Sequence, residues 1–214
     1  MQLVLDADYG FTKNVKNSED LPVWDQFRLN KIGEIFTTCS KIIDFGSSSR
    51  SLTTLFEAEL AHKLCVSLDI NSVYRPNITA DICDLPLETD SIDGIICAAI
   101  LEHVYNPFAA VSELYRILRP GGKLFIYVPW MYQYHGNNQY NDFYRYSRDG
   151  LRYMLRDFSN VELCPLRGRL ETSLNFIPRL GKHSRFIKYF GTLIRKFDDY
   201  GDKHTSGFNV YAVK

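Results

Sequence analysis

The feature that most constrains the fold is a series of short apolar runs associated with carboxylates. Residues 41–49 read Lys-Ile-Ile-Asp-Phe-Gly-Ser-Ser-Ser, which is typical of a buried strand that enters a tight turn. Residues 66–70 form a second apolar run that contains Asp69, and residues 80–86 follow with Asp81. A strand, a turn of small residues, a helix and a second strand ending in an acid indicate a nucleotide-binding βαβ unit.

This order of segments favours a ligand that contains a nucleoside. Gly46 permits backbone angles that let a ligand approach the turn closely. Asp69 can accept hydrogen bonds from both hydroxyls of a ribose, and the segment that contains Asp81 would lie beside an adenine. NAD is the weaker alternative, because the Gly-x-Gly-x-x-Gly pattern of dinucleotide sites is reduced here to its first glycine.

Strand and helix patterns alternate along the rest of the chain. The apolar runs lack polar alternation, which indicates strands covered on both faces, and the order predicts a mostly parallel two-sided α/β sheet. Residues 119–122 (Arg-Pro-Gly-Gly) are expected to end a helix. We expect strands at 42–45, 64–68, 77–80, 92–98, 123–128, 161–166 and 208–213, and helices at 25–36, 51–62, 107–118, 148–156 and within 172–197.

Composition narrows the classes of partner. The chain has 214 residues, of which 45% are hydrophobic, and this suits one compact domain. Lys+Arg and Asp+Glu both number 25, so nothing in the overall charge indicates nucleic acid, and no apolar run is long enough to span a bilayer. The five cysteines lack metal-ligand spacing, and no signal peptide is evident, so we expect a reducing cytoplasmic compartment and no metal site.

The second half of the chain is the more basic one. Most of its excess lies in residues 167–196, where Glu171 is the single acid. This charge fits an anionic acceptor or peripheral contact with a membrane surface, and the alternative is a solvated helix face that covers the sheet. The sequence is equally compatible with a monomer and a homodimer.

Several motifs together resemble the class I S-adenosylmethionine-dependent methyltransferases, specifically the methyltransferase type-11 group. The resemblance extends from about Lys41 to Leu155 and implies a Rossmann-like, mostly parallel seven-stranded sheet with helices on both faces and an antiparallel last strand. We expect one methyltransferase domain over 1–214, with an N-terminal segment and helix (1–40), a cofactor-binding core (41–128) and a substrate-side part (129–214). The matching segments are residues 42–46, Asp69, residues 81–86, residues 91–96, residues 101–104 and residues 118–122.

The resemblance also implies a set of contacts to S-adenosylmethionine. The positions that usually hold glycine in the first motif are Gly46, Ser48 and Arg50, and only the first is glycine here. This departure motivates the alternative of a non-catalytic Rossmann-like binding or regulatory module. The implied cofactor contacts are Asp44, Gly46, Ser47 and Ser48 at the methionine end, Asp69 and Ile70 at the ribose and adenine, Asp81 and Ile82 at the adenine, and Ala98 and Ala99 at the sulfonium.

Two histidines are candidate catalytic bases, since a hydroxyl or amine acceptor must lose a proton during methyl transfer. His103 follows the strand expected at 92–98, and His135 lies in an aromatic loop over 130–147 that would roof the substrate pocket. Aromatic walls suit a sugar ring or a planar group, and the resemblance suggests a small-molecule or glycan-linked acceptor methylated on oxygen or nitrogen. The candidate substrate contacts are Tyr132, Tyr134, Asp142, Tyr144 and Arg145, with an Asp142–Arg145 ion pair as the structural alternative.

Overall fold

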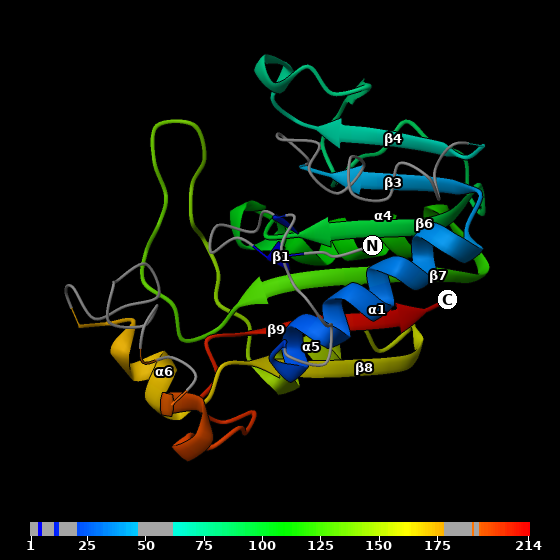
Figure 1. The fold of residues 1–214 in the computed structure, drawn as a ribbon. Coiled ribbons are helices and arrows are strands. Elements are labelled where there is room, and N and C mark those ends of the chain that lie inside the picture. The colour runs from blue at the N-terminus through cyan, green and yellow to red at the C-terminus, as the bar shows by residue number, and fades with distance from the viewer. Residues whose placement is uncertain (1–3, 6–10, 13–20, 47–61, 178–189, 191–192) are drawn as a thin grey trace.

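A computed structural model describes residues 4–5, 11–12, 21–46, 62–177, 190 and 193–214 (Figure 1). Its centre is a seven-stranded sheet in the order β5-β4-β3-β6-β7-β9-β8. A separate antiparallel pair joins β1 (Val4–Leu5) to β2 (Phe11–Thr12). The strands of the large sheet are β3 (Lys41–Phe45), β4 (Leu64–Asp69), β5 (Ile78–Thr79), β6 (Ile92–Ala98), β7 (Leu118–Pro129), β8 (Ser159–Leu166) and β9 (Gly207–Val213).

The pairing of the strands confirms the expected mixed sheet. β3 pairs in parallel with both β4 and β6, β4 pairs in parallel with β5, and β6 with β7. β9, the last strand in sequence, lies between β7 and β8 and is antiparallel to both. All seven strands overlap the segments expected from their apolar runs.

Helices cover both faces of this sheet, as Figure 1 shows for α1 (Val23–Thr38) in front and α4 (Pro107–Ile117) behind. Each face has its own apolar core, because neighbouring residues of a strand point to opposite sides. On one side α1 packs with Ile42, Ile96 and Phe125, and on the other α4 packs with Ile43, Ile95 and Leu124. Other helices among the described residues include α5 (Arg148–Met154), α6 (Arg169–Leu174) and the 3₁₀ turns η2 (Ser72–Tyr74) and η3 (Leu101–His103).

Two of the expected helical segments lie largely outside the residues that the structure describes. The helix expected at 51–62 falls almost wholly outside the described residues, and so does much of 172–197. No helix in the described part of the chain combines the length and apolar character that crossing a bilayer requires.

The expected start of β7 was wrong. The Arg-Pro-Gly-Gly segment at 119–122 does not lie between a helix and a strand, because β7 already begins at Leu118, which pairs with Ile92. The register then shifts before Gly94, and Gly121, at φ +77°, donates its backbone N–H to Lys214 at 2.9 Å. The proline and the glycines therefore form an irregular strand entry rather than a separate turn.

Asp93 of β6 fixes the start of the neighbouring strand. Its Oδ2 accepts the backbone N–H groups of Ser40 and Lys41 at 2.9 Å each, and Arg119 forms an ion pair with it. Burial acts to raise the pKa of Asp93, but these donors more than offset it and hold the pKa below its usual range. The carboxylate therefore stabilises the fold in its charged form.

Replacing Asp93 with alanine is expected to lower the free energy of unfolding at pH 7 by about 1–3 kcal/mol, since two backbone N–H donors and Arg119 lose a charged acceptor. Because the pKa is lowered in the folded state, this stabilisation is present above the unfolded pKa of about 4 and is lost as the pH falls below it. Urea unfolding of Asp93→Ala and of the exposed control Glu88→Ala tests this. An equal difference from the wild type at pH 7 and pH 3 would contradict it.

Candidate active site

Four neighbouring parallel strands end at one edge of the sheet and gather the predicted site residues there. β3, β4, β6 and β7 run in the same direction, and the long loop after β7 extends from this edge (Figure 1). In open α/β sheets, ligands bind outside the carboxyl ends of such strands. The edge is therefore the candidate ligand site.

Gly46, directly after β3, holds a conformation and a position that require glycine. Its φ is +66°, and its N–H donates to the carbonyl of Leu68 at 2.8 Å. A Cβ placed on it would lie 2.0 Å from Cδ1 of Ile100, so a side chain here would displace that isoleucine. Asp44, two residues earlier, is buried within β3, whereas Ser47 and Ser48 lie outside the described residues.

Asp69 and Asp81 lie next to each other in the fold, at the ends of neighbouring segments. The carbonyl of Asp69 accepts the N–H of Ala80 at 3.1 Å. Each carboxylate uses Oδ1 to accept a backbone N–H two residues on, Asn71 at 2.9 Å for Asp69 and Cys83 at 2.8 Å for Asp81. Both acids therefore have the turn geometry that fixes a carboxylate in place.

The apolar candidates differ in exposure. Ile70 is 67% exposed, which leaves its side chain open to a planar ligand, whereas Ile82 is buried. Ala98 is the last residue of β6, and Ala99, which follows it at φ +57°, donates its N–H to the carbonyl of Tyr127 at 2.9 Å. These two small residues mark the centre of the edge, between Gly46 and the loop after β7.

The loop over 130–146 is held at its base by hydrogen bonds to η3. The N–H of Phe143 donates to the carbonyl of Glu102 at 2.8 Å, and the hydroxyl of Tyr146 donates to the carbonyl of Leu101 at 2.6 Å. Ser147 then caps α5 by accepting the N–H of Gly150 at 3.2 Å, as expected from its position. This anchoring places the loop against the residues that follow β6.

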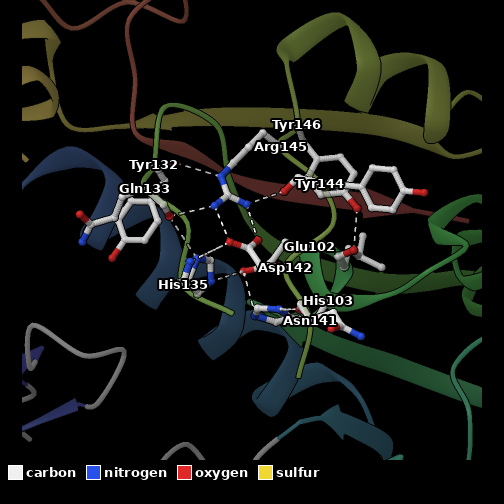
Figure 2. Close-up of polar contacts among 11 residues, drawn as sticks. Glu102, His103, Tyr132, Gln133, His135, Asn141, Asp142, Tyr144, Arg145 and Tyr146 are labelled. Carbon is white, nitrogen blue, oxygen red and sulfur yellow. Dashed lines mark hydrogen bonds and ion pairs between the residues drawn. The ribbon is translucent and has the colours of Figure 1, made fainter. Parts of the chain in front are cut away.

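Within the loop, Asp142 and Arg145 form the ion pair that was the structural alternative to substrate binding (Figure 2). The guanidinium group also donates to the carbonyls of Tyr132 at 3.0 Å and Gln133 at 2.8 Å, and the buried Asp142 carboxylate accepts the N–H of His135 at 2.8 Å. Burial acts to raise the pKa of Asp142, but Arg145 and His135 lower it to about 2. The pair therefore holds the loop in a fixed path.

Replacing Arg145 with methionine is expected to lower the free energy of unfolding by about 2–3 kcal/mol, because the buried Asp142 carboxylate loses its charged donor. The double variant Arg145→Met/Asp142→Asn should recover part of that loss. Arg148→Met serves as the control, since Arg148 forms more exposed ion pairs with Asp149 and Asp202. Additive effects of the two single substitutions in urea unfolding would contradict this role of the pair.

The fixed loop path brings the two predicted histidines together. The rings of His103 and His135 are 5.0 Å apart, edge to face. Nδ1 of His135 lies 3.2 Å from Oδ2 of Asp142, and Nδ1 of His103 lies 2.5 Å from the carbonyl oxygen of Asn141. Figure 2 shows both rings beside Glu102, whose Oε1 is 3.9 Å from Nε2 of each histidine.

Glu102 is the site residue that sequence reasoning missed. It lies in the Leu-Glu-His-Val motif at residues 101–104, but no site role was predicted for it. Its place directly before His103 was the sequence feature that could have indicated one. Its side chain is 1% exposed, and burial raises its pKa to about 8, with Asp142 adding to the effect. Burial also lowers the pKa of His103. The site therefore holds a buried carboxyl group and two imidazoles within reach of one another.

Only some of the tyrosines in the loop contact the two histidines. The ring of Tyr132 packs edge-on against His135 at 5.4 Å, and Tyr140, which was not singled out from sequence, lies 4.4 Å from His103. Tyr144 donates its hydroxyl to the carbonyl of Tyr105 at 3.0 Å, and Tyr134 is 72% exposed. Tyr132 and Tyr140 thus border the histidines, and Tyr144 is a contact of the loop with its base.

Comparison with solved structures supports this description of the fold. An S-adenosylmethionine-dependent methyltransferase from Archaeoglobus fulgidus has a TM-score of 0.60 at 16% identity, with 88% of this chain and 92% of that chain covered. Phosphoethanolamine N-methyltransferase 2 of Haemonchus contortus, solved with S-adenosyl-L-methionine, has a TM-score of 0.55 at 16% identity, with 88% and 52% covered. At these identities the likeness concerns the fold.

Sequence comparison gives a family and short local matches. Residues 43–126 match the family described as methyltransferase domain. The ubiquinone biosynthesis O-methyltransferase of Xanthomonas oryzae pv. oryzae is 46% identical over 39 residues, which cover 18% of this chain and 16% of that protein. The demethylmenaquinone methyltransferase of Clavibacter sepedonicus is 39% identical over 49 residues, covering 23% and 20%. The matches thus span a fifth or less of these curated relatives.

Proposed function

Because residues 43–126 match the methyltransferase domain family, we propose that this chain transfers the methyl group of S-adenosylmethionine to an oxygen or nitrogen atom of a small molecule. The observation that carries the proposal is the gathering of Asp69, Asp81 and the His103–His135 pair at one carboxyl edge of a methyltransferase-type sheet. Carboxylates suited to a nucleoside thus lie at the same edge as groups suited to proton transfer.

The cofactor would lie across the ends of β3, β4 and β6. Asp69 would accept the ribose hydroxyls through its carboxylate, whose orientation the turn with Asn71 fixes. Asp81 and the backbone of Ile82 would contact the adenine, and the exposed Ile70 would pack against its face. The methionine end would lie beside Asp44, Gly46, Ser47 and Ser48, with the sulfonium close to Ala98 and Ala99.

The reaction requires that the acceptor atom be aligned with the methyl group and that the acceptor lose one proton. The acceptor atom attacks the methyl carbon in line, the carbon–sulfur bond breaks, and S-adenosylhomocysteine leaves with the electron pair. His135 would take the acceptor's proton at Nε2, because its Nδ1 faces the Asp142 carboxylate, which favours the proton on Nδ1. Asp142 and Arg145 would then be positioning residues rather than substrate contacts.

Aromatic side chains support a flat or ring-shaped acceptor. Tyr132 and Tyr140 border the two histidines, and their faces and hydroxyls suit a sugar ring or a planar aromatic group. Relatives named as ubiquinone-biosynthesis and demethylmenaquinone methyltransferases support a small-molecule acceptor. Glycan-linked acceptors remain within this class, and the basic segment at 167–196 favours an anionic one.

A screen for release of S-adenosylhomocysteine tests this proposal. The chain would be incubated with S-adenosylmethionine and a panel of hydroxylated aromatics, sugars, phosphorylated amines and nucleotide sugars. We expect product with at least one member, and at a cofactor concentration below the wild-type Kd we expect at least about tenfold less product with the Asp69→Asn variant. Cofactor binding without turnover on any such acceptor would favour the non-catalytic binding module instead.

A further inference from the structure

The cluster formed by Glu102, His103 and His135 has the composition of a metal site. One ligand atom from each residue, a carboxylate oxygen or an imidazole nitrogen, lies within 4.8 Å of the other two. We propose that these three side chains bind one divalent first-row transition-metal ion of the zinc type. The spacing along the sequence predicted no such site, because the loop after β7 supplies the third ligand.

The two histidines are oriented as metal ligands usually are. Nδ1 of His103 lies 2.5 Å from the carbonyl oxygen of Asn141, and Nδ1 of His135 lies 3.2 Å from Oδ2 of Asp142. A proton donated from each Nδ1 leaves each Nε2 with a lone pair, and both Nε2 atoms are 3.9 Å from Oε1 of Glu102. Metal-bound histidines typically donate their other ring N–H to a carbonyl or a carboxylate in this way.

The carboxylate of Glu102 supplies an independent observation. Its side chain is 1% exposed, and its Oε2 is buried without a hydrogen-bond partner among the described residues. Buried polar atoms in native proteins are nearly always paired, and an unpaired one calls for an explanation such as an ion. Oε1 is the oxygen that faces the two imidazoles, so an ion held there by both carboxylate oxygens would also give Oε2 its missing partner.

The geometry needs only a small closure to hold an ion. Ligand atoms bound at about 2.1 Å lie roughly 3–3.5 Å apart. The 3.9 Å distances from Oε1 of Glu102 to each Nε2 would therefore shrink by less than about an ångström, and the remaining separation, which is at most 4.8 Å, by less than about 2 Å. Two imidazoles and one carboxylate suit zinc and its first-row neighbours, and three protein ligands leave a coordination position open. Both ligand-bearing segments are tied together, since Phe143 donates its N–H to the carbonyl of Glu102 at 2.8 Å.

An ion here would change how the acceptor is deprotonated, and this consequence rests on the proposed function. An acceptor hydroxyl bound at the open position would lose its proton more readily, as water does on zinc. With the ion bound, Nε2 of His135 would be a ligand, and the proton would pass to solvent. Without the ion, the same nitrogen would be the base.

Metal titration tests the site without any acceptor. The full chain, free of an affinity tag and stripped with a chelator, would be titrated with Co²⁺ by absorption and with Zn²⁺ by calorimetry. We expect one ion per chain and Co²⁺ spectra of nitrogen and oxygen ligation, without the sulfur charge-transfer band that the free cysteines would give. Less than one ion per chain, or a spectrum dominated by that sulfur band, would overturn the proposal.

Variants separate this site from adventitious binding. Glu102→Gln, His103→Asn and His135→Asn should each weaken Zn²⁺ binding more than about tenfold, and Asp142→Asn by about 10–100-fold. His204→Asn, on an exposed histidine outside the site, is the matched control. Zn²⁺ should also raise the melting temperature of wild type and His204→Asn but not of Glu102→Gln, which checks that the variants fold.

The outcomes for the ion and for the cofactor are distinguishable. Unchanged Zn²⁺ affinity in Glu102→Gln or in His103→Asn would overturn the metal site. We expect the chain stripped of metal by the chelator still to bind S-adenosylmethionine, since Glu102, His103 and His135 provide none of the proposed cofactor contacts. Loss of metal binding with the cofactor still bound would overturn only the present inference, whereas metal binding without cofactor affinity would overturn only the proposed function.

Discussion

Asp69→Asn is expected to weaken the binding of S-adenosylmethionine by roughly ten- to one-hundred-fold, which corresponds to about 1–3 kcal/mol for loss of a charged hydrogen-bond acceptor. Asparagine retains an oxygen that can accept the N–H of Asn71, so the local turn should persist. It loses the charge and one acceptor oxygen, which the two ribose hydroxyls would need together. Calorimetric titration of both proteins with the cofactor measures the difference.

Asp84 offers a matched control for this experiment. It is an exposed acid in the turn that follows Asp81, and the proposal gives it no cofactor contact. Asp84→Asn should therefore bind S-adenosylmethionine as the wild type does. Equal affinity in Asp69→Asn and Asp84→Asn would remove Asp69 from the ribose site.

His135→Ala is expected to lower kcat by about 10²–10⁴-fold while cofactor affinity stays within about twofold of the wild type. The reason is that Nε2 of His135 lies beside Glu102 and His103, whereas the proposed cofactor contacts come from other segments. The measurement is S-adenosylhomocysteine release on the acceptor found in the screen, together with a cofactor titration of the same sample.

Two further variants, His204→Asn and Asp142→Asn, complete this experiment. His204→Asn should leave kcat unchanged, since His204 is an exposed histidine outside the site. Asp142→Asn should lower kcat less than His135→Ala does, because it disturbs the orientation of His135 without removing it. Full turnover in His135→Ala would exclude His135 both as the base and as a ligand to a required ion.

The fold was predictable because its strands are covered on both faces. Strands such as Ile42–Phe45 and Ile92–Ala98 are mostly apolar and lack regular polar alternation, which is typical of a sheet covered on both faces, and their alternation with helices leaves few arrangements. The entry into β7 was not predictable in the same way, since proline and glycine at 120–122 suggest a turn. Pairing of Leu118 with Ile92 and of Gly121 with Lys214 places them within the sheet instead.

The candidate site was predictable only in part, because strand order positions its acidic residues whereas the path of a loop positions one of its histidines. Asp69 and Asp81 follow strands, so their place at the sheet edge comes directly from the strand order. The meeting of His135 with His103 depends on the path of a long loop, which hydrogen bonds from Arg145 to backbone carbonyls hold. The spacing of residues along the sequence does not predict such contacts. The position of Glu102 beside the two histidines is likewise seen only in the structure.

Calorimetric titration of the purified wild-type chain with S-adenosylmethionine and S-adenosylhomocysteine tests the central claim most directly. We expect one binding site per chain with micromolar affinity for both compounds, despite serine and arginine at the positions of the second and third motif glycines. Absence of binding at millimolar concentrations of either compound would contradict it, and the chain would then keep a methyltransferase fold without a methyltransferase's cofactor.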